Sequence, residues 1–132
     1  MSRVFADTFY FLAVLNRQDP AHAEAMDFYG DASLGFVTTE WVLTEMGDAM
    51  AKPGLRPNFQ RLIGLLEKDP QMTVIPASRE LFHRGLALYF ARPDKEWSLT
   101  NCISFVVMQD EGLTDALTGD HHFAQANFAV LL

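Results

Sequence analysis

The sequence predicts an α/β fold in which helices cover both faces of a central parallel sheet of four or five strands. Short apolar segments of strand length alternate with longer segments of helical periodicity, an alternation typical of β-α units. Of the 132 residues, 49% are hydrophobic and 20% are charged, so the chain is long enough to bury a core and too apolar for a disordered protein. We therefore expect a single domain over residues 1–132.

In the first half of the chain, turn-forming residues separate apolar segments of two lengths. Asp19 and Pro20 open a helix, because Asp caps helices and Pro suits their first turn. Pro53 and Gly54 end another helix. The expected order is a strand at 2–6, a helix at 9–16, the helix opened by Asp19, a strand at 35–37, a helix capped by Thr38 or Thr39, and a helix at 59–66.

The second half continues the alternation to the end of the chain. Pro76 closes a strand at 72–75, and Ser78 begins a helix that ends near Arg92 and Pro93. Ser98 or Thr100 caps a helix at 101–110, whose nearly continuous apolar residues predict burial on most sides, and Gly112 ends it as a C-cap. The remaining expected elements are a strand at 113–118, a short helix at 122–126 and a strand at 128–132 on the sheet edge.

Acidic side chains follow these predicted strands. Asp7 comes directly after the first strand, Glu45 lies in the helix after the second, and Asp120 follows the fourth. Active sites of open parallel sheets form at the carboxyl ends of the strands, so these acids are candidates for one site. Each acid also fits an ordinary role, because Asp7 and Asp120 suit helix caps and Glu45 suits a solvated helix surface.

Four segments, taken together, resemble the motifs of PIN domains of the VapC toxin type. The segments are residues 4–8 (VFADT), 38–45 (TTEWVLTE), 97–105 (WSLTNCISF) and 113–123 (LTDALTGDHHF). They occur in the order of the family and cover nearly the whole chain, and the last two are the most specific. At position 101 the family normally has Asp, whereas this chain has Asn101.

The resemblance implies a metal-dependent ribonuclease that acts as the toxin of a toxin–antitoxin pair. It implies that RNA is the substrate, that an antitoxin protein is a partner, and that the chain forms a homodimer. The implied cofactor is Mg²⁺ or Mn²⁺, and Mg²⁺ prefers hard oxygen ligands such as carboxylates. The implied catalytic and metal-binding residues are Asp7, Glu45, Asn101 and Asp120, with Thr8, Ser98 and Asp115 as supporting residues and Asp94 as a weaker candidate.

Asn101 is the departure from the family that bears on activity. An amide oxygen can coordinate a metal, but it brings no negative charge to offset a dication. Loss of even an outer partner of a metal ligand costs about 10- to 100-fold in affinity or activity. Two explanations stay open: an inactivating substitution made to trap the enzyme, and a natural protein with weakened or lost catalysis.

Charge and composition limit the other functional classes. The formal net charge of −7 argues against a general nucleic-acid binder, although bound cations would invert the potential around clustered acids. The single cysteine, Cys102, cannot form an internal disulfide, and no apolar run approaches a membrane span, so we expect a cytoplasmic protein. His121 and His122 are expected to lie on the surface at a helix start, and the alternative is a role as ligands of a transition metal, which His suits better than it suits Mg²⁺. Phe9, Tyr10 and Phe11 cannot all face inward, so one or two of them are expected at an interface.

Two other functions remain as alternatives. A catalytically impaired PIN-like domain would act as a protein- or RNA-binding module. A nuclease directed at DNA, or a phosphatase, would use similar acids. Metal titration distinguishes the first alternative, because a binding module need not hold a divalent ion among its acids, and substrate competition distinguishes the second.

Overall fold

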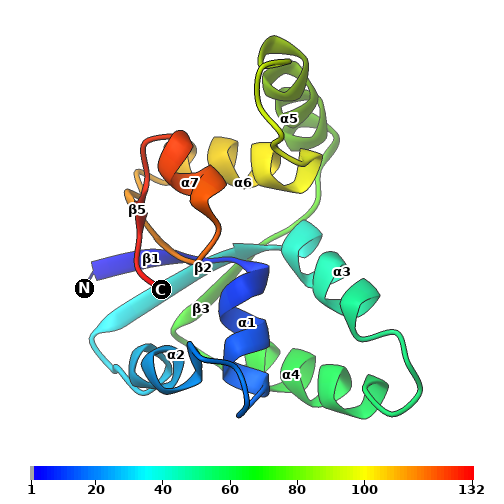
Figure 1. Ribbon diagram of the computed structural model, residues 1–132, viewed down its shortest axis with the longest axis vertical. Coiled ribbons are helices and arrows are strands. Elements are labelled where there is room, and N and C mark those ends of the chain that lie inside the picture. Colours follow the sequence, from blue (N-terminus) through cyan, green and yellow to red (C-terminus); the bar gives the residue numbers. More distant parts are fainter. Residues whose placement is uncertain (1) are drawn as a thin grey trace.

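The computed structural model describes residues 2–132, which form a five-stranded sheet flanked by helices (Figure 1). All neighbouring strands pair in parallel, in the order β3-β2-β1-β4-β5. The predicted α/β class with a parallel sheet is confirmed. The strands are β1 (Ser2–Ala6), β2 (Leu34–Thr39), β3 (Met72–Ile75), β4 (Asp115–Leu117) and β5 (Ala129–Val130).

Each predicted helix is present, with ends shifted by a few residues. The helices are α1 (Thr8–Leu15), α2 (His22–Tyr29), α3 (Glu40–Ala49), α4 (Arg56–Lys68), α5 (Arg79–Ala91), α6 (Leu99–Asp110) and α7 (His121–Gln125). The largest difference is α4, which begins at Arg56 rather than at residue 59. Pro57 lies in its first turn, where a missing backbone N–H leaves no hydrogen bond unmade.

Hydroxyl side chains fix where the two helices that carry site residues begin. Thr39 caps α3 by accepting a hydrogen bond from the backbone N–H of Val42 at 3.1 Å, whereas Thr38 stays within β2. Ser98 caps α6 by accepting from the backbone N–H of Asn101 at 3.0 Å. The structure thus decides between the two cap residues expected for each helix.

The strand order reverses between β1 and β4. From β1 the chain proceeds to β2 and then β3 on one side, and it returns to place β4 and β5 on the other side. Right-handed crossovers in opposite directions put their helices on opposite faces of a sheet. Figure 1 accordingly shows α6 and α7 across the sheet from α1, α2 and α4, which is the predicted three-layer arrangement. Such a reversal point opens a crevice at the carboxyl ends of its two strands.

The buried core includes residues from both helical layers, and α6 is its most completely buried helix. All residues of α6 from Asn101 to Met108 are buried, as its apolar sequence predicted. The ring of Phe105 lies 5.0 Å from that of Phe123 and 5.0 Å from that of Trp97, in edge-to-face geometry that favours aromatic pairs. None of the helices within residues 2–132 is long and apolar enough to cross a membrane.

The aromatic run after Asp7 divides between the core and the surface. Tyr10 and Phe11 are buried, whereas Phe9 is partly exposed and its ring lies against Gly119. The expectation that the three rings cannot all face inward is confirmed, and a role for Phe9 at an interface stays a prediction.

Helix α5 projects from the body of the molecule and packs chiefly against α6 (Figure 1). The contact depends on Gly85, the buried residue of α5, because a Cβ atom there would overlap the side chain of Ile103. Gly85→Ala is expected to lower the free energy of unfolding by about 1–3 kcal/mol, since an overpacked contact must separate. Urea denaturation followed by circular dichroism measures the change.

Gly64→Ala is the matched control for that substitution. Gly64 also lies inside a helix, α4, but nothing stands within 4 Å of a Cβ built there. Alanine has the higher helix propensity, so this change is expected to stabilise the protein by up to about 1 kcal/mol. Equal effects of the two substitutions would show that α5 can shift freely on α6.

Candidate active site

Asp7 stands at the crevice between the carboxyl ends of β1 and β4. Its backbone N–H donates to the carbonyl of Leu117 at 3.4 Å, which continues the pairing of the two strands. The hydroxyl of Thr118, just after β4, donates to Oδ2 of Asp7 at 2.9 Å. Asp7 precedes α1, yet its side chain makes no capping hydrogen bond, and the residue is only 5% exposed. The capping interpretation of Asp7 is therefore wrong, and its buried carboxylate needs another explanation.

Glu45 reaches the same region from α3. The hydroxyl of Thr8, at the first residue of α1, donates a hydrogen bond to Oε1 of Glu45. Because Thr8 directly follows Asp7, this bond ties Glu45 to the end of β1. Glu45 is half-buried and does not extend freely into solvent.

Asp120 and Asn101 approach each other beyond the carboxyl end of β4. Oδ1 of Asp120 accepts from the backbone N–H of His122 at 2.9 Å, so Asp120 does cap α7. Its second oxygen, Oδ2, lies 3.5 Å from the amide nitrogen of Asn101, which is buried in the first turn of α6. The cap therefore leaves one carboxylate oxygen facing the crevice. We call Asp7, Glu45, Asn101 and Asp120 the strand-end cluster.

Burial and neighbouring charge shift the titration of Asp7. Burial raises its pKa from 3.8 to about 6, opposed by the hydrogen bonds from Thr118 and from the backbone of Thr8, while the charges of Glu45 and Asp120 raise it further. Geometry links Asp7 to Asp120 as well: Thr118 donates to Asp7 and accepts a hydrogen bond from the backbone N–H of Asp120 at 3.1 Å. Within residues 2–132 no Lys or Arg forms an ion pair with any of the three acids. The cluster has an excess of negative charge that a bound cation would relieve.

The raised pKa of Asp7 predicts how the metal-free protein responds to pH. The pKa of Asp7 in the folded protein, about 6, exceeds its reference value of 3.8, so the folded protein binds this proton more tightly than the unfolded chain does. The stability that the protonated carboxyl contributes is therefore complete below pH 3.8 and is lost as the pH rises through 6. At pH 8 with a chelator, Asp7→Asn is expected to raise the free energy of unfolding by roughly 1–3 kcal/mol, at about 1.4 kcal/mol for each pKa unit. Urea denaturation at pH 8 and pH 5 measures the change, which should shrink at the lower pH.

Asp48→Asn serves as the control for this prediction, because Asp48 is an exposed acid of α3. Exposed substitutions of this kind usually change stability by less than about 0.5 kcal/mol. A loss of stability in Asp7→Asn at pH 8 would show that the Asp7 carboxylate is well solvated or already compensated.

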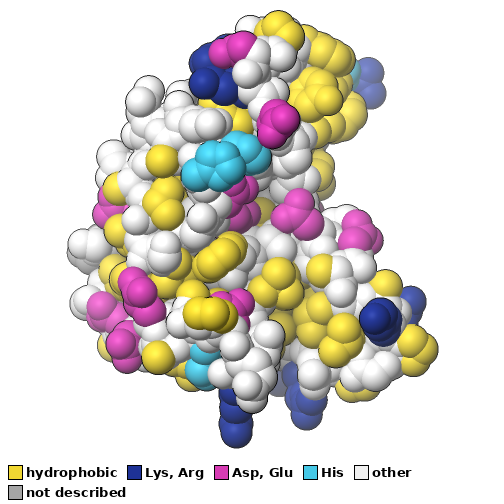
Figure 2. All heavy atoms as spheres, in the orientation of Figure 1, with side chains coloured by type: hydrophobic (Ala, Val, Ile, Leu, Met, Phe, Trp, Pro, Cys, Tyr) yellow, Lys and Arg dark blue, Asp and Glu magenta, His cyan; other side chains and the backbone are white. Residues whose placement is uncertain are grey.

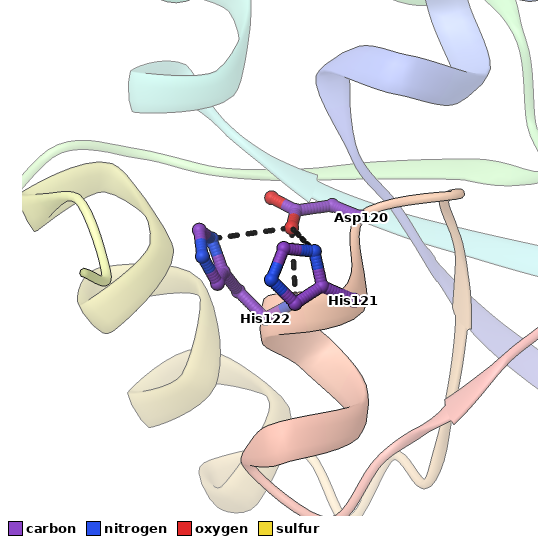
Figure 3. Close-up of side chains that lie close together, drawn as sticks. All are labelled: Asp120, His121 and His122. Atoms are coloured by element: carbon purple, nitrogen blue, oxygen red, sulfur yellow. Dashed lines mark hydrogen bonds and ion pairs between the residues drawn. The ribbon is translucent and has the colours of Figure 1, made fainter. Parts of the chain in front are cut away.

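The two histidines after Asp120 differ in their environments (Figure 3). The His121 side chain is 75% exposed, as expected for a surface helix start, and its Nδ1 is 4.0 Å from Oδ1 of Asp120. The His122 side chain is only 19% exposed; its Nδ1 lies 3.2 Å from the same oxygen and 3.4 Å from the amide nitrogen of Asn101. The prediction that both decorate the surface is wrong for His122. Asp120, His121 and His122 each offer a ligand atom within 4.8 Å of the others.

The supporting residues predicted from the sequence have different positions. Thr8 contacts Glu45, and Ser98 holds the backbone of Asn101, so both touch the strand-end cluster. Asp115 begins β4, at the end of the strand away from the crevice, and accepts a hydrogen bond from Thr114 at 3.2 Å. Asp94 forms ion pairs with Arg92 and Lys95, and the Arg92 hydrogen bonds lower its pKa to about 2. The structure therefore brings Thr8 and Ser98 to the cluster and engages Asp94 elsewhere.

Sequence reasoning missed two residues of the site, Thr118 and His122. Thr118 is a buried hydroxyl residue at the carboxyl end of β4, and that position was the available signal. His122 gave no signal beyond its proximity to Asp120 in the sequence. Figure 2 shows histidine and acidic side chains together on one face, beside a hollow between α5 and α3.

No protein-family model and no curated protein matches this sequence. Three solved structures share its fold over nearly their whole length. VapC20 from Mycobacterium tuberculosis, described as a sarcin-ricin loop cleaving toxin, superposes with a TM-score of 0.83 at 21% identity and covers 96% of each chain. VapBC2 from Rickettsia felis, bound to a DNA fragment from their promoter, gives a TM-score of 0.69 at 11% identity, with coverage of 97% of this chain and 96% of that one.

FitAcB from Neisseria gonorrhoeae gives a TM-score of 0.66 at 15% identity, covering 98% of this chain and 96% of its own. Similarity at these identities shows the fold. It confirms, at the level of the fold, the resemblance to PIN domains of the VapC type that the four sequence segments indicated.

Proposed function

We propose that this chain is a divalent-metal-dependent endoribonuclease that hydrolyses RNA phosphodiester bonds, and that it is the toxin of a toxin–antitoxin pair. The observation that carries the proposal is that hydrogen bonds of Thr8 and Thr118 hold Asp7, Glu45 and Asp120 together at the point where the strand order reverses. The fold, shared with a sarcin-ricin loop cleaving toxin, supports the same function. RNA containing that loop is accordingly one substrate to test.

The donor atoms of the strand-end cluster fit Mg²⁺ or Mn²⁺. Three carboxylates and the amide oxygen of Asn101 are hard oxygen ligands, which these ions prefer. The ion would be held by Asp7, Glu45, Asn101 and Asp120. Among the described residues no Lys or Arg is paired with these acids, so their negative charge is available to the ion. When bound, a divalent ion supplies charge neutralisation at the phosphate and a more acidic water.

The protein's own contribution is to position these groups before the substrate arrives. Thr118 orients the Asp7 carboxylate and Thr8 orients that of Glu45, so neither has to be ordered during the reaction. Asp120 is fixed by its capping bond to α7. Ligands that are ordered in advance in this way would hold a cation without reorganisation at the moment of cleavage.

An antitoxin protein and a second copy of the chain are the proposed protein partners. Apolar side chains from α1 and α4, including Val14, Leu62 and Leu65, line a cavity of about 290 Å³ that a helix of an antitoxin would fill. Homodimerisation and a cytoplasmic location are proposed on the resemblance alone.

The direct test is cleavage of an RNA panel with Mn²⁺ or Mg²⁺, with an excess of chelator as control. The panel includes a sarcin-ricin loop hairpin, other hairpins, single strands, DNA and a small phosphoester. Cleavage of RNA that stops with chelator is the expected result. Faster cleavage of DNA or of the phosphoester would favour the other substrate classes.

One observation favours a second candidate, an impaired PIN-like domain that binds RNA or protein without cutting. The amide nitrogen of Asn101, rather than an acid, faces Asp120, so the cluster has one negative charge fewer than the family pattern implies. Intact RNA with every ion, from a protein that still binds RNA, would support this candidate over the nuclease.

A further inference from the structure

A cavity of about 740 Å³ lies between the end of α5, the loop that follows it, and the first turn of α6. Its wall includes Tyr89, Phe90, Arg92, Lys95, Trp97 and Ser98, and we call it the α5–α6 pocket. We propose that the α5–α6 pocket is a substrate subsite that receives an unstacked base of single-stranded or looped RNA. The inference rests on the proposed function in taking this RNA to be the one cut at the strand-end cluster.

Two aromatic side chains of the pocket are exposed to an extent that the fold does not require. Tyr89 is 45% exposed and Phe90 is 70% exposed, and their rings pack edge to face at 5.6 Å. Neither belongs to the hydrophobic core. Unstacked RNA bases stack on such aromatic rings, and every base has a face that can do so.

A third flat surface of the pocket is built from Arg92. Its guanidinium lies 5.1 Å from the centre of the Trp97 ring, and two of its nitrogens donate to the two carboxylate oxygens of Asp94, each at 3.0 Å. The guanidinium plane is thus held at one edge by Asp94 and against Trp97. Bases stack on arginine planes as well as on aromatic rings.

The charges around the pocket favour recognition of a base over binding of the phosphate backbone. Two acids, Asp94 and Glu96, stand beside two basic residues, Arg92 and Lys95, so the formal charges of these four residues sum to zero. Binding by stacking depends weakly on salt, whereas phosphate contacts lose affinity steeply as salt rises. Lys95 can still contact one phosphate beside the bound base.

The pocket adjoins the strand-end cluster at the first turn of α6. Ser98 lines the pocket and accepts the hydrogen bond from the backbone of Asn101, and Cys102, the residue after Asn101, also lines it. The lining thus includes the residue after Asn101 and the residue that caps its helix. This adjacency argues for a nucleotide near the cut bond, rather than a protein partner, as the occupant. A continuous duplex does not fit, because its bases stay stacked.

The test measures RNA binding in the presence of a chelator, so that it does not depend on cleavage. Fluorescence anisotropy follows a labelled hairpin with a single-stranded loop and a fully paired duplex of equal length. The variants are Tyr89→Ala and Phe90→Ala, and the control is Tyr29→Ala, because Tyr29 is 46% exposed but lies on α2, outside the pocket. Thermal denaturation establishes that all three are folded.

Both pocket variants are expected to bind the loop RNA about tenfold more weakly than the unmodified chain, with little change for the duplex. Tyr29→Ala should bind both RNAs normally. Unchanged loop affinity in both pocket variants overturns the subsite, as does an equal loss with loop and duplex. Sedimentation that shows a dimer dissociating in these variants, while RNA affinity holds, would assign the pocket to a second copy and also overturns it.

The outcomes separate this inference from the proposed function. Loop binding through the pocket by a chain that cuts no RNA, even as Asn101→Asp, would uphold the subsite and reject the nuclease. Metal-dependent cleavage with normal loop binding by both pocket variants would uphold the nuclease and reject the subsite.

Discussion

Asn101→Asp is expected to raise the rate of RNA cleavage by about 10- to 100-fold and to tighten the binding of Mn²⁺. Asn101 is buried in the first turn of α6, and its amide nitrogen lies 3.5 Å from Oδ2 of Asp120. A carboxylate at this position would add a fourth negative charge to a cluster that already lacks a paired Lys or Arg within residues 2–132. The hydrogen bond to Asp120 would be replaced by repulsion, which a bound dication relieves.

The same repulsion gives the substitution a signature that does not depend on turnover. Without metal, Asn101→Asp should unfold at a lower temperature than the unmodified chain, and saturating Mn²⁺ should restore the loss. Isothermal titration with Mn²⁺, thermal denaturation with and without metal, and initial cleavage rates at equal protein concentration measure the three effects.

Asn58→Asp is a suitable control for that experiment, because it adds the same charge in the first turn of α4, on a helix remote from α6 and α7 (Figure 1). It should leave metal binding and cleavage unchanged. If Asn101→Asp also leaves both unchanged, position 101 is not a ligand, and the strand-end cluster reduces to three acids.

The sequence predicted the positions of strand ends well where a distinctive residue marks them. β1 and β3 have the predicted bounds, because Asp7 and Pro76 interrupt the apolar runs. β4 and β5 are shorter than the apolar segments that predicted them. Beyond β5, Leu131 and Leu132 still donate backbone hydrogen bonds to Ala116 and Thr118, but outside the regular strand. α4 begins before its predicted start, because Pro57 suits the first turn of a helix.

The residues of the site, like the strand ends, could be predicted only where a feature of the sequence marks them. Strand-end placement made Asp7 and Asp120 candidates, because parallel strands put their carboxyl ends at one edge, and the resemblance to PIN domains implied their role as ligands. The contacts of Thr118 and His122 depend on the path of the loop after β4 and on side-chain orientation, which periodicity does not encode. The α5–α6 pocket was not predicted either, because it requires the packing of α5 on α6 that Gly85 permits.

Asp7→Asn is expected to lower the rate of RNA cleavage by about a thousandfold or more, while making the metal-free protein more stable at pH 8. Asp7 is the most buried acid of the strand-end cluster, and Thr118 fixes its carboxylate at the crevice between β1 and β4. A bound metal contributes several kcal/mol to stabilising the reaction's charge, and each 1.36 kcal/mol is about tenfold in rate.

Opposite signs of the two effects distinguish a site residue from a structural one. If Asp7 served only the fold, replacing it would lower the stability and the activity of the protein together. Asp7 carries a charge that burial and two neighbouring acids disfavour, so the fold gains when that charge is removed. Cleavage rates and urea denaturation on one preparation of Asp7→Asn, with Asp48→Asn beside it, measure both effects. Full activity in a stabilised Asp7→Asn protein would remove Asp7 from the catalytic set and, with it, the proposal that the strand-end cluster cuts RNA.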